Sequence, residues 1–165
     1  GTLVGYQLDR GMAAEFGLPR SNGCAYADSA SHTAIQRMAN ISLQPVDDGP
    51  DLDGLIGGVD DGIYVVGDKS WSIDMQRFNF QFTGQRFHRI RGGKLVGQLK
   101  DVAYQANTQE FWNACSAICD ERDWRMGGSF FDGKGQPPQI SIVSHGSSTT
   151  RFNGINVINT ARKIG

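Results

Sequence analysis

A cluster of chemically capable side chains lies near the C-terminal end of the chain, within the segment Gly127–His145. The centre of that segment, residues 132–137 with the sequence DGKGQP, places a carboxylate, an ammonium group and an amide beside two glycines. Glycine allows the backbone to approach a ligand closely, and polar side chains on a turn held by strands often form a site. A hairpin turn with solvated side chains has the same composition. Spacing alone therefore leaves a ligand site and a simple tight turn both open.

No complete catalytic motif accompanies this cluster. His32, His88 and His145 are far apart, and none has a partner at the spacing of a metal-binding helix such as HExxH. The Gly133-Lys134 pair lacks the upstream glycines and the following Ser or Thr of a phosphate-binding loop. His145 lies between serines, but neighbours in sequence do not form a catalytic triad. We therefore assign no catalytic residue within this chain.

The three cysteines favour a reducing compartment. Cys24, Cys115 and Cys119 are odd in number and sparsely spaced, which disfavours a disulfide framework and favours the cytoplasm. Cys115 and Cys119 lie four residues apart on a predicted helix face, but no second Cys or His pair lies near them in sequence. We expect buried structural thiols rather than a shared metal.

Length and charge indicate one domain. A chain of 165 residues can bury a core of its own, so we predict a single domain over residues 1–165. Sixteen Lys and Arg against 17 Asp and Glu weigh against direct nucleic-acid or membrane-surface binding. No apolar run approaches the ~20 residues of a membrane span. The chain starts without Met inside a predicted strand, so we expect a fragment or a processed piece.

Residue periodicity predicts an α+β fold with a mostly antiparallel sheet and a few short helices. Helices are expected over residues 10–16, 51–56 and 107–119. Asp9 can cap the first of these helices and Asn107 can cap the last. Gly92-Gly93 predicts a hairpin turn. Strands are expected over residues 3–8, 35–43, 63–66, 71–82, 85–90, 94–99, 140–143 and 152–158, and residues 127–131 lead into the GKGQ turn.

Several segments, taken in order, resemble a single family. They are GYQLDR at 5–10, RMAN at 37–40, GIYV at 62–65, FNFQF at 78–82, GKGQ at 133–136 and SHG at 144–146. The set resembles the C-terminal half of the TldD/PmbA proteins, long described as modulators of DNA gyrase, whose TldD-type members are zinc metalloproteases. The resemblance covers nearly the whole chain and implies the C-terminal domain fold of that family.

The resemblance also implies a metal site that this chain would complete. In the family, zinc is held by two histidines of an HExxxH helix, whose Glu is the general base, and by a cysteine just before the Gly-Lys of the turn. HExxxH is absent from this chain, and the cysteine position is Asp132. A carboxylate can join two histidines in a zinc site, with an altered metal preference. Asp132 is thus the candidate metal ligand, and loss of the metal is the alternative.

Roles for the neighbouring residues follow from the same resemblance. Beside a metal, Lys134 is expected to stabilise an oxyanion or a substrate carboxylate, together with the N–H groups of Gly133 and Gly135. Gln136 and His145 are expected to orient neighbouring groups. A hydrogen-bonded structural role is the alternative for His145.

The function implied is that of the substrate-cleft domain of a TldD-like zinc metalloprotease. Such a protein would hydrolyse unfolded or extended peptides with zinc-activated water, and the isolated chain would be inactive because two ligands and the base lie elsewhere. One alternative is a non-catalytic PmbA-like partner subunit. Another is a regulatory module linked to DNA gyrase or its inhibitors, although the balanced charge argues against direct DNA contact. The family further implies a homodimer, or a heterodimer with another member.

Overall fold

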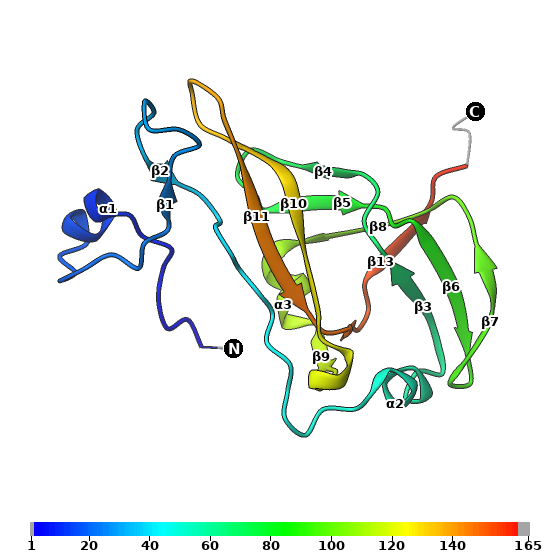
Figure 1. The fold of residues 1–165 in the computed structure, drawn as a ribbon. Coiled ribbons are helices and arrows are strands. Elements are labelled where there is room, and N and C mark those ends of the chain that lie inside the picture. The colour runs from blue at the N-terminus through cyan, green and yellow to red at the C-terminus, as the bar shows by residue number, and fades with distance from the viewer. Residues whose placement is uncertain (1, 162–165) are drawn as a thin grey trace. The chain divides into compact units, whose positions relative to one another are not determined.

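The structure is a computed structural model that describes residues 2–161, and its backbone divides into two compact units. The hairpin unit comprises the residues up to Gln44 together with Trp124–Ser147, and the sheet unit comprises Pro45–Asp123 together with the residues from Ser148 on. Figure 1 colours both units along the chain. Two compact units do not by themselves mark a domain boundary, so the single domain over 1–165 stays a prediction.

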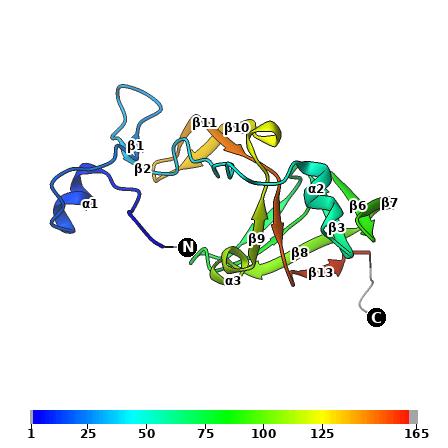
Figure 2. The same cartoon turned by 90° about the horizontal axis from the view of Figure 1, so that it is seen from below.

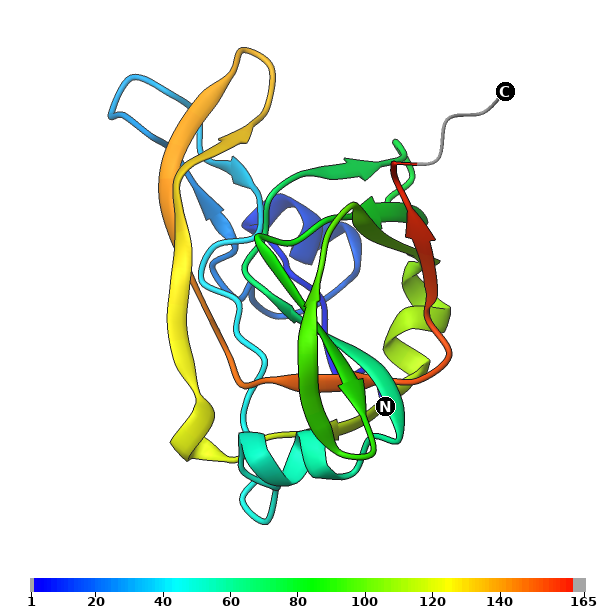
Figure 3. The same ribbon diagram turned by 90° about the vertical axis from the view of Figure 1, so that its right-hand side faces the viewer.

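The hairpin unit is built on one long antiparallel hairpin. Strands β10 (Arg125–Lys134) and β11 (Gln139–Ser147) pair along their length, with a register shift between Ser129 and Asp132. A second, much shorter hairpin, β1 (Ala25–Tyr26) with β2 (Ile35–Gln36), lies beside the tip of the long one (Figures 1 and 3). This juxtaposition brings residues from two distant parts of the sequence to one place.

Helix α1 (Arg10–Glu15) forms where its capping residue predicts it. The Asp9 carboxylate accepts a hydrogen bond from the Met12 N–H at 2.7 Å, which satisfies one of the free donors of the first turn. Gly17, at φ +64°, follows the helix end in the left-handed conformation that glycine favours. The predicted helix over 10–16 is therefore confirmed, one residue shorter.

The sheet unit consists of antiparallel strands with short helices at its periphery (Figure 2). Its sheets have the strand orders β13-β8-β5-β4, β3-β6-β7 and β12-β9. This arrangement confirms the α+β, mostly antiparallel class. No helix in residues 2–161 is long and apolar enough to cross a membrane. The elements are α2 (Leu52–Gly57), β3 (Asp61–Val66), β4 (Trp71–Ile73), β5 (Asn79–Phe82), β6 (Arg86–Arg91), β7 (Lys94–Leu99), β8 (Val102–Asn107), α3 (Thr108–Asn113), β9 (Cys115–Ile118), η1 (Glu121–Asp123), β12 (Thr150–Phe152) and β13 (Asn156–Asn159).

Aromatic rings contribute much of the packing of the sheet unit. Phe111 stacks on Phe152 with ring centroids 3.9 Å apart, and Phe80 meets Phe111 edge-on at 5.1 Å. Such pairs contribute beyond the apolar area that they bury. Of the aromatics between residues 71 and 87, Phe87 is buried, Phe80 and Phe82 are half-buried and stack on each other, and Trp71 is 66% exposed.

Several predicted element boundaries are wrong. Residues 3–8 form no regular strand, and the strand predicted over 35–43 is only Ile35–Gln36. The strand predicted over 71–82 is a hairpin, because the Asp74 carboxylate accepts from the N–H groups of Phe78 and Asn79 and closes a turn. The strand predicted over 152–158 is likewise two strands, β12 and β13.

The helix predicted over 107–119 is the largest departure. Asn107 does cap it, accepting from the Glu110 N–H at 2.8 Å, but α3 ends at Asn113. Cys115–Ile118 then form strand β9 and pair with β12, so Cys115 and Cys119 share no helix face. Tertiary pairing overrides the local helical pattern here.

Candidate functional site

The candidate residues lie at the end of the long hairpin, mostly in strand rather than turn. Asp132 pairs with Ser141, Gly133 with Ile140 and Lys134 with Gln139 across the β10–β11 ladder. The turn itself begins only at Gly135, so the tight turn predicted over 132–137 is shorter than expected. Strand pairing fixes the directions in which Asp132 and Lys134 point.

Asp132 is held by an arginine and a tyrosine from the short hairpin. The Arg37 guanidinium donates from Nε to Oδ2 and from Nη2 to Oδ1, both at 3.1 Å, and the Tyr26 hydroxyl donates to Oδ2 at 3.3 Å. The Asp132 side chain is 18% exposed and that of Arg37 25%. This is the two-pronged pairing in which guanidinium and carboxylate bind most strongly.

The ionisation of this group follows from its contacts. The hydrogen bonds from Arg37 hold the pKa of Asp132 below its usual value, although burial acts in the opposite direction. The same hydrogen bonding raises the pKa of Arg37. Burial, and then the Asp132 charge, raise the pKa of the Tyr26 hydroxyl, which stays a neutral donor. Asp132 is therefore a carboxylate at neutral pH, with its charge balanced.

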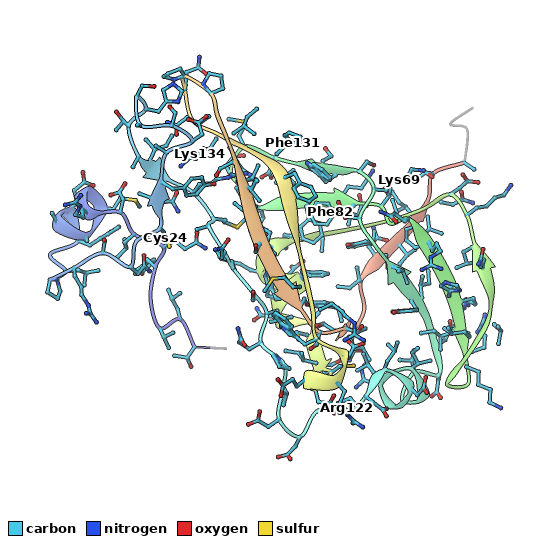
Figure 4. The ribbon with its side chains drawn as sticks, viewed as in Figure 1. Cys24, Lys69, Phe82, Arg122, Phe131 and Lys134 are labelled. Carbon is cyan, nitrogen blue, oxygen red and sulfur yellow. The ribbon has the colours of Figure 1, made fainter. Side chains whose placement is uncertain are left out.

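Lys134 points into the protein, beside β1 and β2 at the hairpin tip (Figure 4). It is only 8% exposed, and its ammonium donates to the carbonyls of Tyr26 and, at 2.9 Å, Ile35. The Nζ atom also lies 3.2 Å from the centre of the Tyr26 ring, a cation–π contact. Burial lowers the pKa of Lys134, and the carboxylates of Asp28 and Asp132 oppose that shift. The side chain thus joins the long hairpin to the short one.

Two further polar residues, Gln139 and Asp28, also connect the short hairpin to the tip of the long one. Gln139 is 4% exposed and donates from Nε2 to the Thr33 carbonyl at 2.9 Å. The Asp28 carboxylate accepts from the Ile140 N–H at 2.9 Å and lies 2.5 Å from His32 Nδ1. These contacts lower the pKa of Asp28, with the Ile140 hydrogen bond as the larger cause. The loop between β1 and β2 is therefore fastened to the hairpin tip at several points.

His145 has a separate environment on β11. Its Nδ1 lies 3.0 Å from the Ile41 carbonyl, and the flanking N–H groups of Ser144 and Gly146 donate to Asn40 Oδ1 and Ser42 Oγ at 2.9 Å each. These contacts hold His145 against residues 40–42, about a hundred positions earlier, and its influence on Asp132 is electrostatic and minor. They favour the structural role that was the alternative for this residue.

The remaining candidates are more exposed. Gln136, Gly133 and Gly135 all lie at the surface. Gly135 has φ +73°, and a Cβ there would collide with the Ile35 side chain, so this position requires glycine for conformation and space. Its presence is explained without a ligand.

Arg37, Tyr26, Asp28 and Gln139 were not singled out as site residues in the sequence. Arg37 appeared there only as part of a family-like segment, and it is 95 positions from Asp132. No local spacing connects residues so far apart, and only the pairing of the two hairpins brings them together.

The residues present do not fit a metal ion at Asp132. Both carboxylate oxygens already accept hydrogen bonds from Arg37, and a divalent cation there would meet the guanidinium charge. Within residues 2–161, no three or more His, Cys, Asp or Glu side chains gather as a metal site. Asp132 as a zinc ligand stays a prediction, and the structure gives its carboxylate a different cation.

The cysteines do not supply a site either. All three are free thiols. Cys119 is fully buried, and burial, with the nearby carboxylates of Asp123, Asp120 and Asp51, raises its pKa to about 11. Cys119 matches the expected buried structural thiol, whereas Cys24 and Cys115 are half-buried.

Comparison with known proteins places this architecture in a family. Residues 1–159 match the model described as the PmbA/TldA metallopeptidase C-terminal domain. A metalloprotease of Methanothermobacter thermautotrophicus is 29% identical over 136 residues, which cover 82% of this chain and 29% of that protein. A metalloprotease TldD homologue of Buchnera aphidicola is 28% identical over 146 residues, covering 87% and 30%.

A solved structure shares the fold. TldE from Thermococcus kodakarensis superposes with a TM-score of 0.58 at 20% identity, covering 92% of this chain and 31% of that one. The chain thus spans about 30% of the length of the curated relatives that it matches.

Proposed function

Because the chain belongs to the PmbA/TldA metallopeptidase family through its C-terminal domain, we propose that it binds the substrate of a TldD-like zinc metalloprotease acting on unfolded or extended peptides. The relatives named metalloproteases support the coarser part of this proposal, since their name implies a metal-dependent peptidase. Zinc as the ion and peptides as the substrate are the finer part.

The observation that carries the proposal is the exposed edge of the long hairpin. Among the described residues, β10 pairs with β11 alone, so its other edge has no partner strand. An extended peptide can add to such an edge through main-chain hydrogen bonds, which are tolerant of sequence. Tolerance of this kind suits a protease that acts on unfolded chains.

The side chains of the hairpin fit the same role. Phe130 and Phe131 on β10 are 75% and 81% exposed, and Met126 and Ile142 are 62% and 70% exposed (Phe131 is labelled in Figure 4). Exposed apolar groups of this density mark binding surfaces more often than plain solvent faces. The contacts of Arg37 and Lys134 hold the hairpin tip, so the edge would be offered in a fixed geometry.

This chain supplies no step of hydrolysis in the proposal. Since Asp132 is paired with Arg37, the metal and the general base would come from the part of the relatives that lies beyond this sequence. The isolated chain would therefore bind peptide and not cleave it. The dimer expected from the family belongs to the proposal as well.

The test uses the full-length protein and an unstructured fluorogenic peptide. Replacing Phe130 and Phe131 together by serine should raise KM and leave kcat unchanged, because peptide binding is weakened and the reacting groups are not. Val96→Ser, at a 58% exposed apolar position on β7, is the matched control and should change neither. An unchanged KM in the double variant would refute the role of this edge.

A second function is favoured by one specific observation. The Arg37–Asp132 pair engages both oxygens of Asp132 in hydrogen bonds, as expected of a non-catalytic PmbA-like partner subunit. In that case the full-length protein would bind the peptide without cleaving it, even with added zinc. Cleavage would then require a catalytic family member in the assay.

A further inference from the structure

We propose that Arg37 supplies the cation for Asp132 in place of a metal ion, so that this end of the hairpin is assembled by a guanidinium–carboxylate pair and takes no metal. This inference does not rest on the proposed peptide binding. It assigns to Arg37 a positioning role that links β2 to β10.

The geometry of the pair supports it first. Two parallel N–H···O contacts of 3.1 Å use both carboxylate oxygens, and the Tyr26 hydroxyl adds a third donor to Oδ2. A planar guanidinium matches a carboxylate in this way, whereas a point charge such as Lys cannot. A metal at Asp132 would have to compete with these donors and with the charge of the guanidinium.

The backbone of Arg37 is held in position as well. Its N–H donates to the Cys24 carbonyl at 3.1 Å, extending the contact between the segments that carry β1 and β2. The side chain therefore starts from a fixed point, and less conformational freedom is lost when the guanidinium meets Asp132. The pair is built into the hairpin contact rather than formed by chance at the surface.

Local charge gives a third, independent argument. The hairpin contact contains two carboxylates, Asp28 and Asp132, and two basic side chains, Arg37 and Lys134, with the His32 imidazole also against Asp28. The two carboxylates therefore already have cationic partners without a metal ion. A divalent cation would add two positive charges to a partly buried site, where repulsion is poorly screened.

Within residues 2–161, no group of three or more His, Cys, Asp or Glu side chains forms a metal site around Asp132. The nearest histidine in sequence, His145, interacts with Asp132 only electrostatically, and its Nδ1 lies 3.0 Å from the Ile41 carbonyl. His32 lies against Asp28 instead. Even with histidines supplied from outside this chain, a carboxylate bound through both oxygens by arginine is a weak zinc ligand, because the metal would compete with the guanidinium for the same oxygens.

The test measures zinc and melting in the full-length protein, not hydrolysis. Each variant is dialysed against zinc and then against metal-free buffer, and zinc per chain is determined by elemental analysis. Asp132→Asn should keep the zinc content and the zinc affinity of the wild type, whatever that content is. A loss of bound zinc, or a fall in affinity of more than about tenfold, would overturn the proposal.

Melting gives the second readout. Asp132→Asn and Arg37→Gln should each lower the temperature midpoint of unfolding. The double variant should melt no lower than the less stable of the two single variants, because both substitutions break the same ion pair. Additive decreases would mean that the two residues act separately and would overturn the proposal. Arg37→Lys, which keeps the charge but not the fork, should also lower the midpoint without changing the zinc content. Arg37→Lys keeps the proposal testable if the other variants fail to fold.

Asp61→Asn is the matched control. Asp61 also pairs with arginine, with Arg91 at 2.7 Å and with Arg89, but its side chain is 51% exposed. Its replacement should shift the midpoint much less, since exposed ion pairs contribute little. Because neither readout depends on peptide cleavage, failure of this proposal and failure of the proposed function are separable.

Discussion

Replacing Lys134 by methionine should destabilise the protein by about 2–4 kcal/mol, because the ammonium, and not the alkyl chain, bonds the short hairpin. The structure shows Nζ bound to the carbonyls of Tyr26 and Ile35 and placed over the Tyr26 ring. Methionine keeps a similar length and apolar stem and removes the charge. The change therefore isolates the polar contribution.

The magnitude follows from the interactions that the ammonium makes. A hydrogen bond from a charged donor contributes about 1.5–3 kcal/mol, a net value that already includes desolvation of donor and acceptor, and the ring interaction adds about 0.5–2 kcal/mol. Tyr26 and Ile35 are only half-buried, so water can replace the ammonium at one of the two carbonyls. The loss of one hydrogen bond and of the ring contact gives a net destabilisation of about 2–4 kcal/mol.

Urea unfolding of the full-length protein measures this destabilisation as a lower midpoint at an unchanged m value. Lys94→Met, at an exposed position on β7, is the control and should change the free energy of unfolding by less than about 0.5 kcal/mol. If Lys134→Met lowered the free energy of unfolding by less than about 1 kcal/mol while peptide cleavage collapsed, the ammonium would serve an oxyanion or substrate carboxylate, as the family resemblance implies. The anchoring role argued from the hydrogen bonds of Nζ would then be refuted.

Three further outcomes are expected. The folded-state pKa of Asp132 lies below its unfolded value of 3.8, so the stability that its carboxylate contributes is present above about pH 4 and is lost as pH falls through the folded pKa. The difference in melting temperature between wild type and Asp132→Asn should therefore shrink with acidification. A difference that stayed constant with pH would contradict this. Cys119, buried with a pKa of about 11, should react with maleimide only after unfolding, as mass spectrometry of labelled peptides would show. Gly146→Ala should destabilise the protein by about 1–3 kcal/mol in thermal melts, since the new Cβ would overlap the Trp124 ring. Gly5→Ala is the control and should be near neutral, because the space around Gly5 is open.

Features set by neighbouring residues could be predicted from the sequence. Asp9, Asp51 and Asn107 each cap a helix, because the acceptor and the N–H that it satisfies are three residues apart. The Gly92-Gly93 turn between β6 and β7 is equally local, with both glycines at positive φ. In these cases the physical cause lies within one turn of chain, so the sequence pattern contains it.

Features set by distant partners could not be predicted. The apolar spacing that predicted a helix through Cys119 is also compatible with a strand, and pairing of β9 with β12 decides between them. The same holds for the site. The sequence marked Asp132 and Lys134, but their partners, Arg37 and the carbonyls of Tyr26 and Ile35, lie about a hundred residues away.

A family resemblance transfers the position of a residue more safely than its role, and Asp132 illustrates why. At the position where the family resemblance implies a thiolate, this chain has a carboxylate, which is a far better hydrogen-bond acceptor for a guanidinium. Arg37 lies within reach of both of its oxygens. The two residues should therefore be considered together, because the carboxylate makes the arginine a partner and the arginine makes the carboxylate unsuited to a metal. Asp132→Cys alone should therefore not create a zinc site, as zinc analysis of that variant would show, since the Arg37 charge would remain beside position 132.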